Sequence, residues 1–250
     1  MNRQAQACVL ILLGGAVLRA SLTDLYLRYV KEGLRPFLIA ASLLLIVTAV
    51  MTLWYDLRPA PRGTADRAAP EGATLAEDDH DGHGHHGLQV AWLLILPVLG
   101  LLLVAPPALG SYAAGQAGTA LTSEQVSEYP PMPDGDPADL TVYDYAARAV
   151  FDKGRSIGDR RVRVTGFTVA GPDGQPLLAR MRLSCCAADG RPIKIGMSGN
   201  VPAQLPDDSW IEVTGRYTDR VGRDPINDLE IPYLEVESWR RVAEPRQPYE

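Results

Sequence analysis

All four histidines of the 250-residue chain lie in one short acidic stretch, EDDHDGHGHHG, at residues 77–87. Imidazole nitrogens bind zinc, copper, nickel and cobalt, and carboxylates add oxygen ligands to the same ions. The glycines let the backbone fold around one ion but leave no rigid site, so we expect modest affinity and quick exchange. A plain solvated linker is the alternative, although histidine is scarce in such linkers. The predicted metal ligands are His80, His83, His85, His86, Asp78, Asp79 and Asp81.

A second group of chemically active residues lies in SCCAAD, residues 184–189. Neighbouring residues of a strand point to opposite faces, so Cys185 and Cys186 share a side only where a turn or bulge intervenes. Three interpretations stay open: a vicinal disulfide, thiolates for a soft metal with Asp189 nearby, or two structural thiols. No histidine follows residue 86, which excludes a cysteine–histidine hydrolase there. We expect a protein that is not an enzyme.

Three apolar runs predict transmembrane helices at about 8–27, 36–55 and 88–110, with the histidine-rich loop in 56–87. The second and third runs carry no charge, and roughly 20 apolar residues in a helix cross a ~30 Å hydrocarbon core. The first run shows no small-residue cleavage site after Leu18, which favours an uncleaved span over a signal peptide. The sequence therefore predicts a multi-pass protein of the cell membrane, surrounded by the lipid bilayer.

Charged residues near these runs bear on how the chain lies in the membrane. Arg19 either snorkels to the interface or pairs with a carboxylate on another membrane subunit. The connection between the first two runs has three Lys and Arg residues, against four in the N-terminus and the loop 56–87 together. The positive-inside rule then leans toward a cytoplasmic histidine loop and an extracytoplasmic C-terminal domain.

The second half of the chain has the pattern of a soluble β-rich domain. Residues 111–139 are small, polar and proline-rich, which predicts a linker. Leu140–Phe151 has helical spacing with Thr141 as N-cap. Gly166 and Gly215, each after Val-Thr, are expected where strands bend sharply. Five segments with period-two alternation follow the helix, separated by Gly, Pro and Asp turns: RVRVTGFTV, LLARMRLSCC, PIKIGM, DDSWIEVTGRYT and NDLEIPYLEVESWRRV.

Five short antiparallel strands indicate a small Greek-key barrel of the OB type at residues 140–245. The predicted fold class is an α+β membrane protein, with about three transmembrane helices followed by this OB-like five-stranded β-barrel domain. OB barrels often bind oligonucleotides, which requires a basic groove with stacked aromatic rings. From Leu140 onward the chain has 16 basic and 16 acidic residues, so the charges of this half balance. The whole chain has a net charge of −6. We therefore expect no nucleic-acid partner.

The order of these features resembles the YcgQ-like family of uncharacterised bacterial membrane proteins. The resemblance rests on three spans, a His/Asp-rich loop before the third, and a β domain that contains RMRLSCCAADGRPI. Its most specific part is Arg180–Asp189, and Val162–Phe167 and Asp207–Gly215 are also similar to family segments. The resemblance implies a subunit that accompanies a larger membrane permease in divalent metal homeostasis, with zinc as the first choice of metal. This chain departs from the family in its short histidine loop without cysteine.

The function expected from the sequence is that of an integral membrane accessory subunit. Its loop would gather zinc or another divalent transition metal, and its barrel would cap or regulate the permease. Two rival hypotheses stay open. One is a membrane-tethered redox or enzyme domain that uses Cys185 and Cys186, and the other is a structural anchor with an incidental loop.

Overall fold

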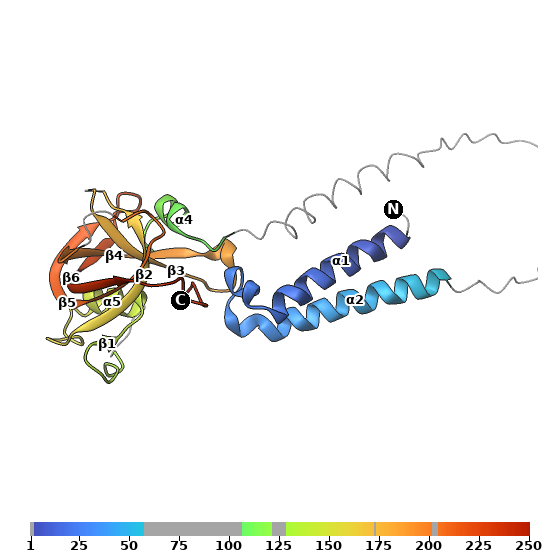
Figure 1. Cartoon of the computed structure of the whole chain (residues 1–250), viewed down its shortest axis with the longest axis horizontal. Helices are drawn as coiled ribbons and strands as arrows, with labels where there is room; N and C mark the ends of the chain where they lie inside the picture. Colours follow the sequence, from blue (N-terminus) through green and yellow to red (C-terminus); the bar gives the residue numbers. More distant parts are fainter. Residues whose placement is uncertain (1–2, 58–106, 122–128, 173, 202–204) are drawn as a thin grey trace, which may run out of the picture. The chain divides into compact units, whose positions relative to one another are not determined.

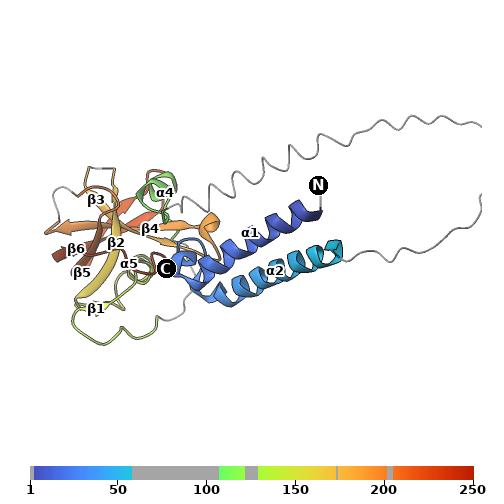
Figure 2. The same ribbon diagram turned by 45° about the vertical axis from the view of Figure 1, so that its right-hand side comes forward.

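The computed structural model divides into two compact units, Met1–Thr23 with Arg35–Pro106 and Asp24–Leu34 with Pro107–Glu250. The histidine-rich loop and most of the third predicted span, 88–110, lie outside the described residues. Figure 1 labels the helices and strands, and Figure 2 shows the same ribbon turned by 45°. The structure describes residues 3–57, 107–121, 129–172, 174–201 and 205–250.

Two apolar helices, α1 (Arg3–Leu22) and α2 (Arg35–Leu57), form the described part of the first unit. At Gly14 of α1 an added Cβ would lie 2.9 Å from Ile46 Cγ1 of α2, so this contact needs a residue without a side chain. Small residues let helix backbones approach closely, which suits packing in lipid. The small buried residues recur every seven positions on both helices: Ala7, Gly14 and Ser21 on α1, and Ser42 and Ala49 on α2.

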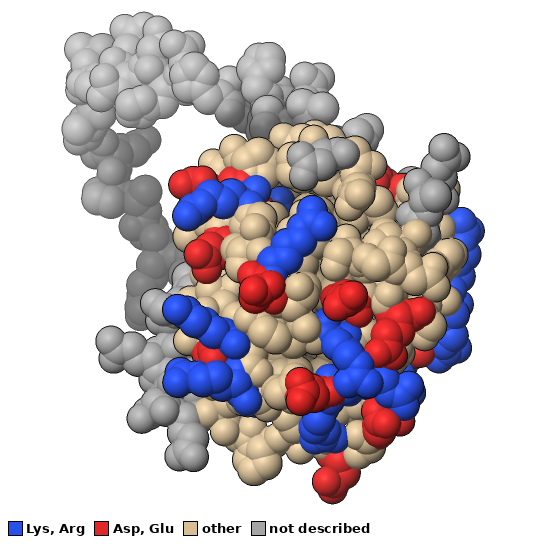
Figure 3. Space-filling model, turned by 90° about the vertical axis from the view of Figure 1, so that its left-hand side faces the viewer, with Lys and Arg blue, Asp and Glu red and all other residues tan. Residues whose placement is uncertain are grey.

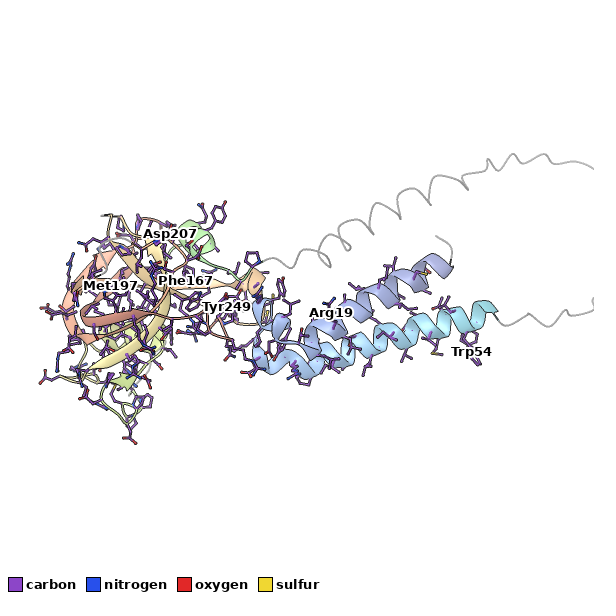
Figure 4. The ribbon with its side chains drawn as sticks, viewed as in Figure 1. Arg19, Trp54, Phe167, Met197, Asp207 and Tyr249 are labelled. Carbon is purple, nitrogen blue, oxygen red and sulfur yellow. The ribbon has the colours of Figure 1, made fainter. Side chains whose placement is uncertain are left out.

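Many of the large apolar side chains of α2 are exposed to the surroundings. Leu44 is 67% exposed and Trp54 is 59% exposed, and Figure 4 shows Trp54 projecting from the helix. The 23 residues of α2 extend about 34 Å, which exceeds a hydrocarbon core of ~30 Å. The stretch Glu32–Tyr55 is long and apolar enough to cross a membrane, and α1 adds a shorter apolar helix, Gln6–Leu22. One or two apolar N-terminal helices are confirmed, whereas three transmembrane helices stay a prediction.

Helix α1 ends before the C-terminal boundary predicted for the first span, 8–27. The Thr23 backbone N–H and hydroxyl both donate to the Arg19 carbonyl, at 3.1 and 3.0 Å, and so satisfy an acceptor of the last turn. Two 3₁₀ helices follow, η1 (Asp24–Arg28) and η2 (Glu32–Leu34). These residues belong to the second unit, and Asp24–Leu34 is called the connecting segment below because it links α1 to α2.

Five strands of the second unit form a closed barrel, which confirms the five-stranded barrel expected from the alternating segments. The order around the barrel is β2-β3-β4-β6-β5, and β5 pairs back with β2. The β4–β6 pair is parallel, and the other four pairs are antiparallel. The strands are β2 (Val162–Ala170), β3 (Pro176–Arg182), β4 (Arg191–Gly199), β5 (Trp210–Arg223) and β6 (Glu230–Arg241).

Helix α5 (Val142–Phe151) packs across the barrel and begins at the predicted N-cap. The Thr141 hydroxyl accepts a hydrogen bond from the Asp144 N–H at 2.9 Å. The helix contacts β2, β3, β4 and β6, and its fully buried Tyr145 donates to the Tyr233 carbonyl at 2.5 Å. The apolar side of α5 thus completes the main core together with inward residues of the strands, among them Val164, Leu178, Ile193, Ile211 and Leu234.

A second, smaller core covers the outer face of β2 and β3. Helix α4 (Ser111–Gln116) places its buried Ala114 there, against Phe167 and Met181. Tyr249 from the C-terminal residues joins the same cluster. Strand β3 is therefore buried on both faces. A two-residue strand that the sequence pattern did not predict, β1 (Ala138–Asp139), pairs in parallel with the start of β2.

A buried ion pair fixes residues that precede the barrel in the chain. Lys194 Nζ lies 2.9 Å from Asp224 Oδ2, and the two side chains are 5% and 0% exposed. The same Asp224 oxygen accepts from the Thr119 N–H at 2.8 Å, and Lys194 Nζ also donates to the Ala117 carbonyl. The pair therefore links β4 to the chain around residue 119.

The two glycines expected at sharp bends permit close contacts between strands. The β5–β6 register shifts between Thr214 and Gly215, where an added Cβ would lie 2.1 Å from the Glu235 carbonyl oxygen. At Gly166 an added Cβ would lie 2.6 Å from the Ala179 carbonyl oxygen. Both positions exclude larger residues unless the strands separate.

Candidate metal centre

The two adjacent cysteines lie in a tight turn between β3 and β4. The sequence prediction carried the strand through Cys186, but β3 ends at Arg182 and a 3₁₀ turn, η3 (Ala187–Asp189), follows. Cys185 is exposed and Cys186 is half-buried, and both are free thiols. Because the backbone leaves the strand before the cysteines, the two side chains are not forced onto opposite faces. Residues Ser184–Asp189 are called the cysteine loop below.

Asp189 organises the cysteine loop through its carboxylate. Its Oδ1 accepts from the Ser184 N–H at 2.8 Å, and its Oδ2 accepts from the Cys185 N–H at 2.8 Å and the Cys186 N–H at 3.4 Å. The Cys186 side chain in turn accepts from the Asp189 N–H. A carboxylate has about four acceptor positions, and three of them hold backbone N–H groups here. Asp189 therefore keeps the loop in one shape.

The charge of Asp189 also controls the proton on Cys185. The hydrogen bond from the Cys185 thiol, with those from the Cys185 and Ser184 N–H groups, lowers the pKa of Asp189 to about 2. The hydrogen bonds to Asp189 and to Cys186 raise the pKa of Cys185 to about 11. At neutral pH the thiol proton thus stays on Cys185, facing an ionised carboxylate. A cation that takes the place of this proton meets a full negative charge on Asp189 and a new one on sulfur.

The three side chains converge closely enough to bind one ion. The sulfur atoms of Cys185 and Cys186 and a carboxylate oxygen of Asp189 all lie within 4.8 Å of one another. Zinc binds thiolates at about 2.3 Å and carboxylate oxygens at about 2.0–2.2 Å, so ligand atoms around one zinc ion lie within such a spacing. Two sulfurs and one oxygen form a soft donor set that leaves a coordination position open. The donor set fits a thiophilic divalent ion.

The connecting segment lies directly against the cysteine loop. The Lys31 N–H donates to the Cys185 carbonyl at 3.0 Å, and the Ala187 N–H donates to the Tyr29 carbonyl at 2.7 Å. Val30 and Cys186 form an isolated antiparallel bridge between these two hydrogen bonds. The loop backbone is thus held from the inside by Asp189 and from the outside by residues 29–31. No pattern in the sequence indicated this pairing.

The other predicted site residues are placed differently. The seven predicted ligands of the histidine-rich loop, within 78–86, lie outside the described residues, so metal binding there stays a prediction. Cys8 lies exposed on α1. Arg19 is also exposed on α1, where Figure 4 labels it. The structure brings together the three residues of the thiol site, Cys185, Cys186 and Asp189.

Acidic and basic side chains are interspersed on the barrel face that Figure 3 shows. Ion pairs explain the mixture in part: Arg240 donates to both Glu212 oxygens at 2.9 Å, and Arg216 Nε lies 2.8 Å from Glu237 Oε1. Pairs of this kind neutralise part of the positive charge that a phosphate backbone would require, and the absence of a nucleic-acid partner stays a prediction.

Comparison with known proteins identifies a domain in this half of the chain. Residues 146–250 match the family described as DUF1980 C-terminal domain, an uncharacterised family. The match begins within α5 and includes the whole barrel and the cysteine loop. It gives no support for the YcgQ-like name, so that part of the resemblance stays a prediction. No curated protein and no solved structure matches the chain.

Proposed function

We propose that this chain is a membrane-anchored accessory protein whose barrel domain binds a thiophilic divalent metal ion, with zinc as the first choice. The observation that carries the proposal is the convergence of two free thiols and a carboxylate within 4.8 Å. Adjacent thiols in a loop shaped by the hydrogen bonds of Asp189 provide ligands whose positions are set before the metal arrives. Preorganised ligands reduce the entropy cost of binding.

The wider role combines this site with the sequence features of the membrane half. We infer three membrane spans, a histidine-rich loop that gathers metal, and a larger permease as partner, as the YcgQ-like resemblance implies. The barrel would then cap or regulate the permease from the extracytoplasmic side. The strand order and the parallel β4–β6 pair favour the OB-type assignment of the barrel.

A redox role for the cysteine pair is the weaker hypothesis. The thiolate is the species that attacks disulfides and other electrophiles, and a raised pKa lowers its population at neutral pH. The hydrogen bonds to Asp189 and to Cys186 hold the pKa of Cys185 at about 11. A raised thiol pKa does not prevent metal binding, because a coordinated cation displaces the proton from the thiol.

Cobalt titration of the full chain in detergent tests the proposal. Cobalt(II) reports on thiolate ligands through a sulfur-to-cobalt charge-transfer band, and zinc should displace it. A Cys8→Ser background leaves the two thiols of the loop. We expect the band in this protein and its loss in the Cys185→Ser/Cys186→Ser variant. A variant with alanine at the four histidines should keep the band but bind less metal in total.

Each possible outcome tests a different part of the proposal. Absence of a thiolate band in the parent protein, with the barrel folded, would show that the cysteine loop is not a metal centre. An unchanged metal total in the four-alanine variant would leave the histidine-rich loop as a solvated linker. At the thiol site the affinity should fall as the pH falls, because protons compete with the metal for sulfur.

A further inference from the structure

We infer that metal binding at the cysteine loop and docking of the connecting segment are one coupled equilibrium, so that metal occupancy fixes the chain that links α1 to α2. This inference rests on the proposed metal site and adds its regulation. The connecting segment, Asp24–Leu34, continues directly into α1 at one end and α2 at the other. Its attachment to the barrel domain is therefore a means by which a bound ion acts on both apolar helices.

One set of contacts joins the segment to the metal ligands themselves. The Cys185 carbonyl and the Ala187 N–H, which flank Cys186, are both paired with backbone groups of residues 29–31. The backbone of the two cysteines thus cannot turn without breaking a hydrogen bond to the segment. A metal ion held by both sulfurs restricts the same backbone torsions. Docking and binding therefore favour the same loop conformation.

A second set of contacts holds the segment from the opposite end of the chain. Residues 246–249, called the C-terminal strap here, place the Tyr249 hydroxyl 2.8 Å from the Arg28 carbonyl and Gln247 Nε2 2.9 Å from Glu32 Oε2. The Arg246 guanidinium pairs with the Asp24 carboxylate. Figure 4 labels Tyr249 at this edge of the barrel. None of these side chains belongs to the metal donor set, so they provide independent handles on docking.

The burial of the segment indicates a docking interaction of limited strength. Of its residues, Tyr26 and Leu27 are buried, each 4% exposed, while Lys31, Glu32 and Gly33 are exposed. Two buried side chains offset only part of the conformational entropy that the segment loses when it is ordered, so its hydrogen bonds to the cysteine loop and to the C-terminal residues must contribute the rest. A bound ion that favours the docked loop conformation shifts the docking equilibrium of such a segment.

Limited trypsin digestion of the full chain in detergent measures docking directly. Trypsin cleaves after Arg28 and Lys31 within the segment, but not after Arg35, which precedes Pro36. Metal at 100 times its Kd stabilises the bound state by up to about 100-fold, so we expect zinc to slow both cleavages by at least about tenfold. The bond after Arg155, whose side chain is 82% exposed, reports trypsin activity in the same digest.

Two kinds of variant separate the coupling from other effects. The Cys185→Ser/Cys186→Ser variant should show no zinc protection of the segment. Tyr249→Phe removes a hydroxyl that bonds Arg28 and Leu109 but leaves the cysteine loop intact. Coupling is reciprocal, so Tyr249→Phe should weaken zinc affinity by about fivefold or more. The control is Tyr112→Phe, at a tyrosine that is 82% exposed.

Gln247→Ala removes the hydrogen bond to Glu32 and is a second way to weaken docking of the connecting segment, in case Tyr249→Phe disturbs the small core. Zinc binding to the parent without protection of the segment, or unchanged affinity in both strap variants, would overturn the coupling while the proposed metal site stands. Absence of zinc binding at the cysteines in the parent would instead overturn the proposed function. Protection of the segment with weakened affinity in the strap variants supports the coupling.

Discussion

Replacement of Asp189 by asparagine should make Cys185 more reactive toward alkylation. Asparagine keeps a carbonyl oxygen for the loop N–H groups but removes the negative charge that holds the thiol proton. The pKa of Cys185 is about 11, raised from an ordinary value of 9.0, with the hydrogen bond to Asp189 as the largest cause. We expect the midpoint of the pH–rate profile to move from about 11 toward about 9 in Asp189→Asn.

The size of the effect follows from two opposing terms. At pH 8 the thiolate fraction is about 0.1% for a pKa of 11 and about 9% for a pKa of 9, a gain of about 90-fold. Intrinsic nucleophilicity falls as the pKa falls, with a Brønsted coefficient of about 0.4–0.5, which costs about six- to tenfold over two units. The net alkylation rate should therefore rise by about tenfold.

Iodoacetamide labelling of the detergent-solubilised full chain, followed by peptide mass spectrometry, gives the rate at each cysteine separately. A Cys8→Ser background simplifies the analysis, and Asp207→Asn, at an exposed acid in the loop before β5, serves as the charge-matched control. A folded Asp189→Asn variant whose Cys185 reacts no faster than the parent would refute the role assigned to Asp189.

Three further perturbations test the membrane half and the barrel. Carbonate should leave the chain in membranes and detergent should release it, because α2 is too apolar to leave in water; recovery in the carbonate supernatant contradicts this. Gly215→Ala should destabilise the barrel by about 1–3 kcal/mol in chemical denaturation, whereas Gly115→Ala, where an added Cβ meets nothing within 4 Å, should have little effect. Lys194→Met should lower the free energy of unfolding by about 3–5 kcal/mol, because Asp224 stays buried without its partner; equal stability would show that the backbone donors suffice.

The sequence predicted those parts of the fold that depend on local patterns. Period-two alternation located all five barrel strands, and Thr141 marked the start of α5, since an N-cap acts within one turn. Cys185, Cys186 and Asp189 could be grouped from the sequence because they lie within five consecutive residues. The end of β3 at Arg182 was harder to predict, because the Asp189 side chain outcompetes strand pairing for the N–H groups of the loop.

Contacts between distant parts of the chain had no local signal. Lys194 lies between Ile193 and Ile195 and would be assigned to a solvated face by alternation, yet residues near 119 bury it. The connecting segment is equally informative. Its charged residues suggest an exposed turn between two membrane spans, but Tyr29 and Lys31 use their backbone groups to pair with the cysteine loop. Backbone pairing carries no side-chain signature, so composition and periodicity could not reveal it.

The separation of Asp24 from its partner Arg246 sets an order of events during synthesis. The two residues are 222 positions apart. At about 5–20 residues per second, a ribosome needs about 11–44 s to proceed from one to the other. Throughout that interval the connecting segment has no strap to bind, whereas α1 is already synthesised at its start and α2 early within it. The two helices therefore reach their surroundings first, and the barrel domain closes on the segment between them afterwards.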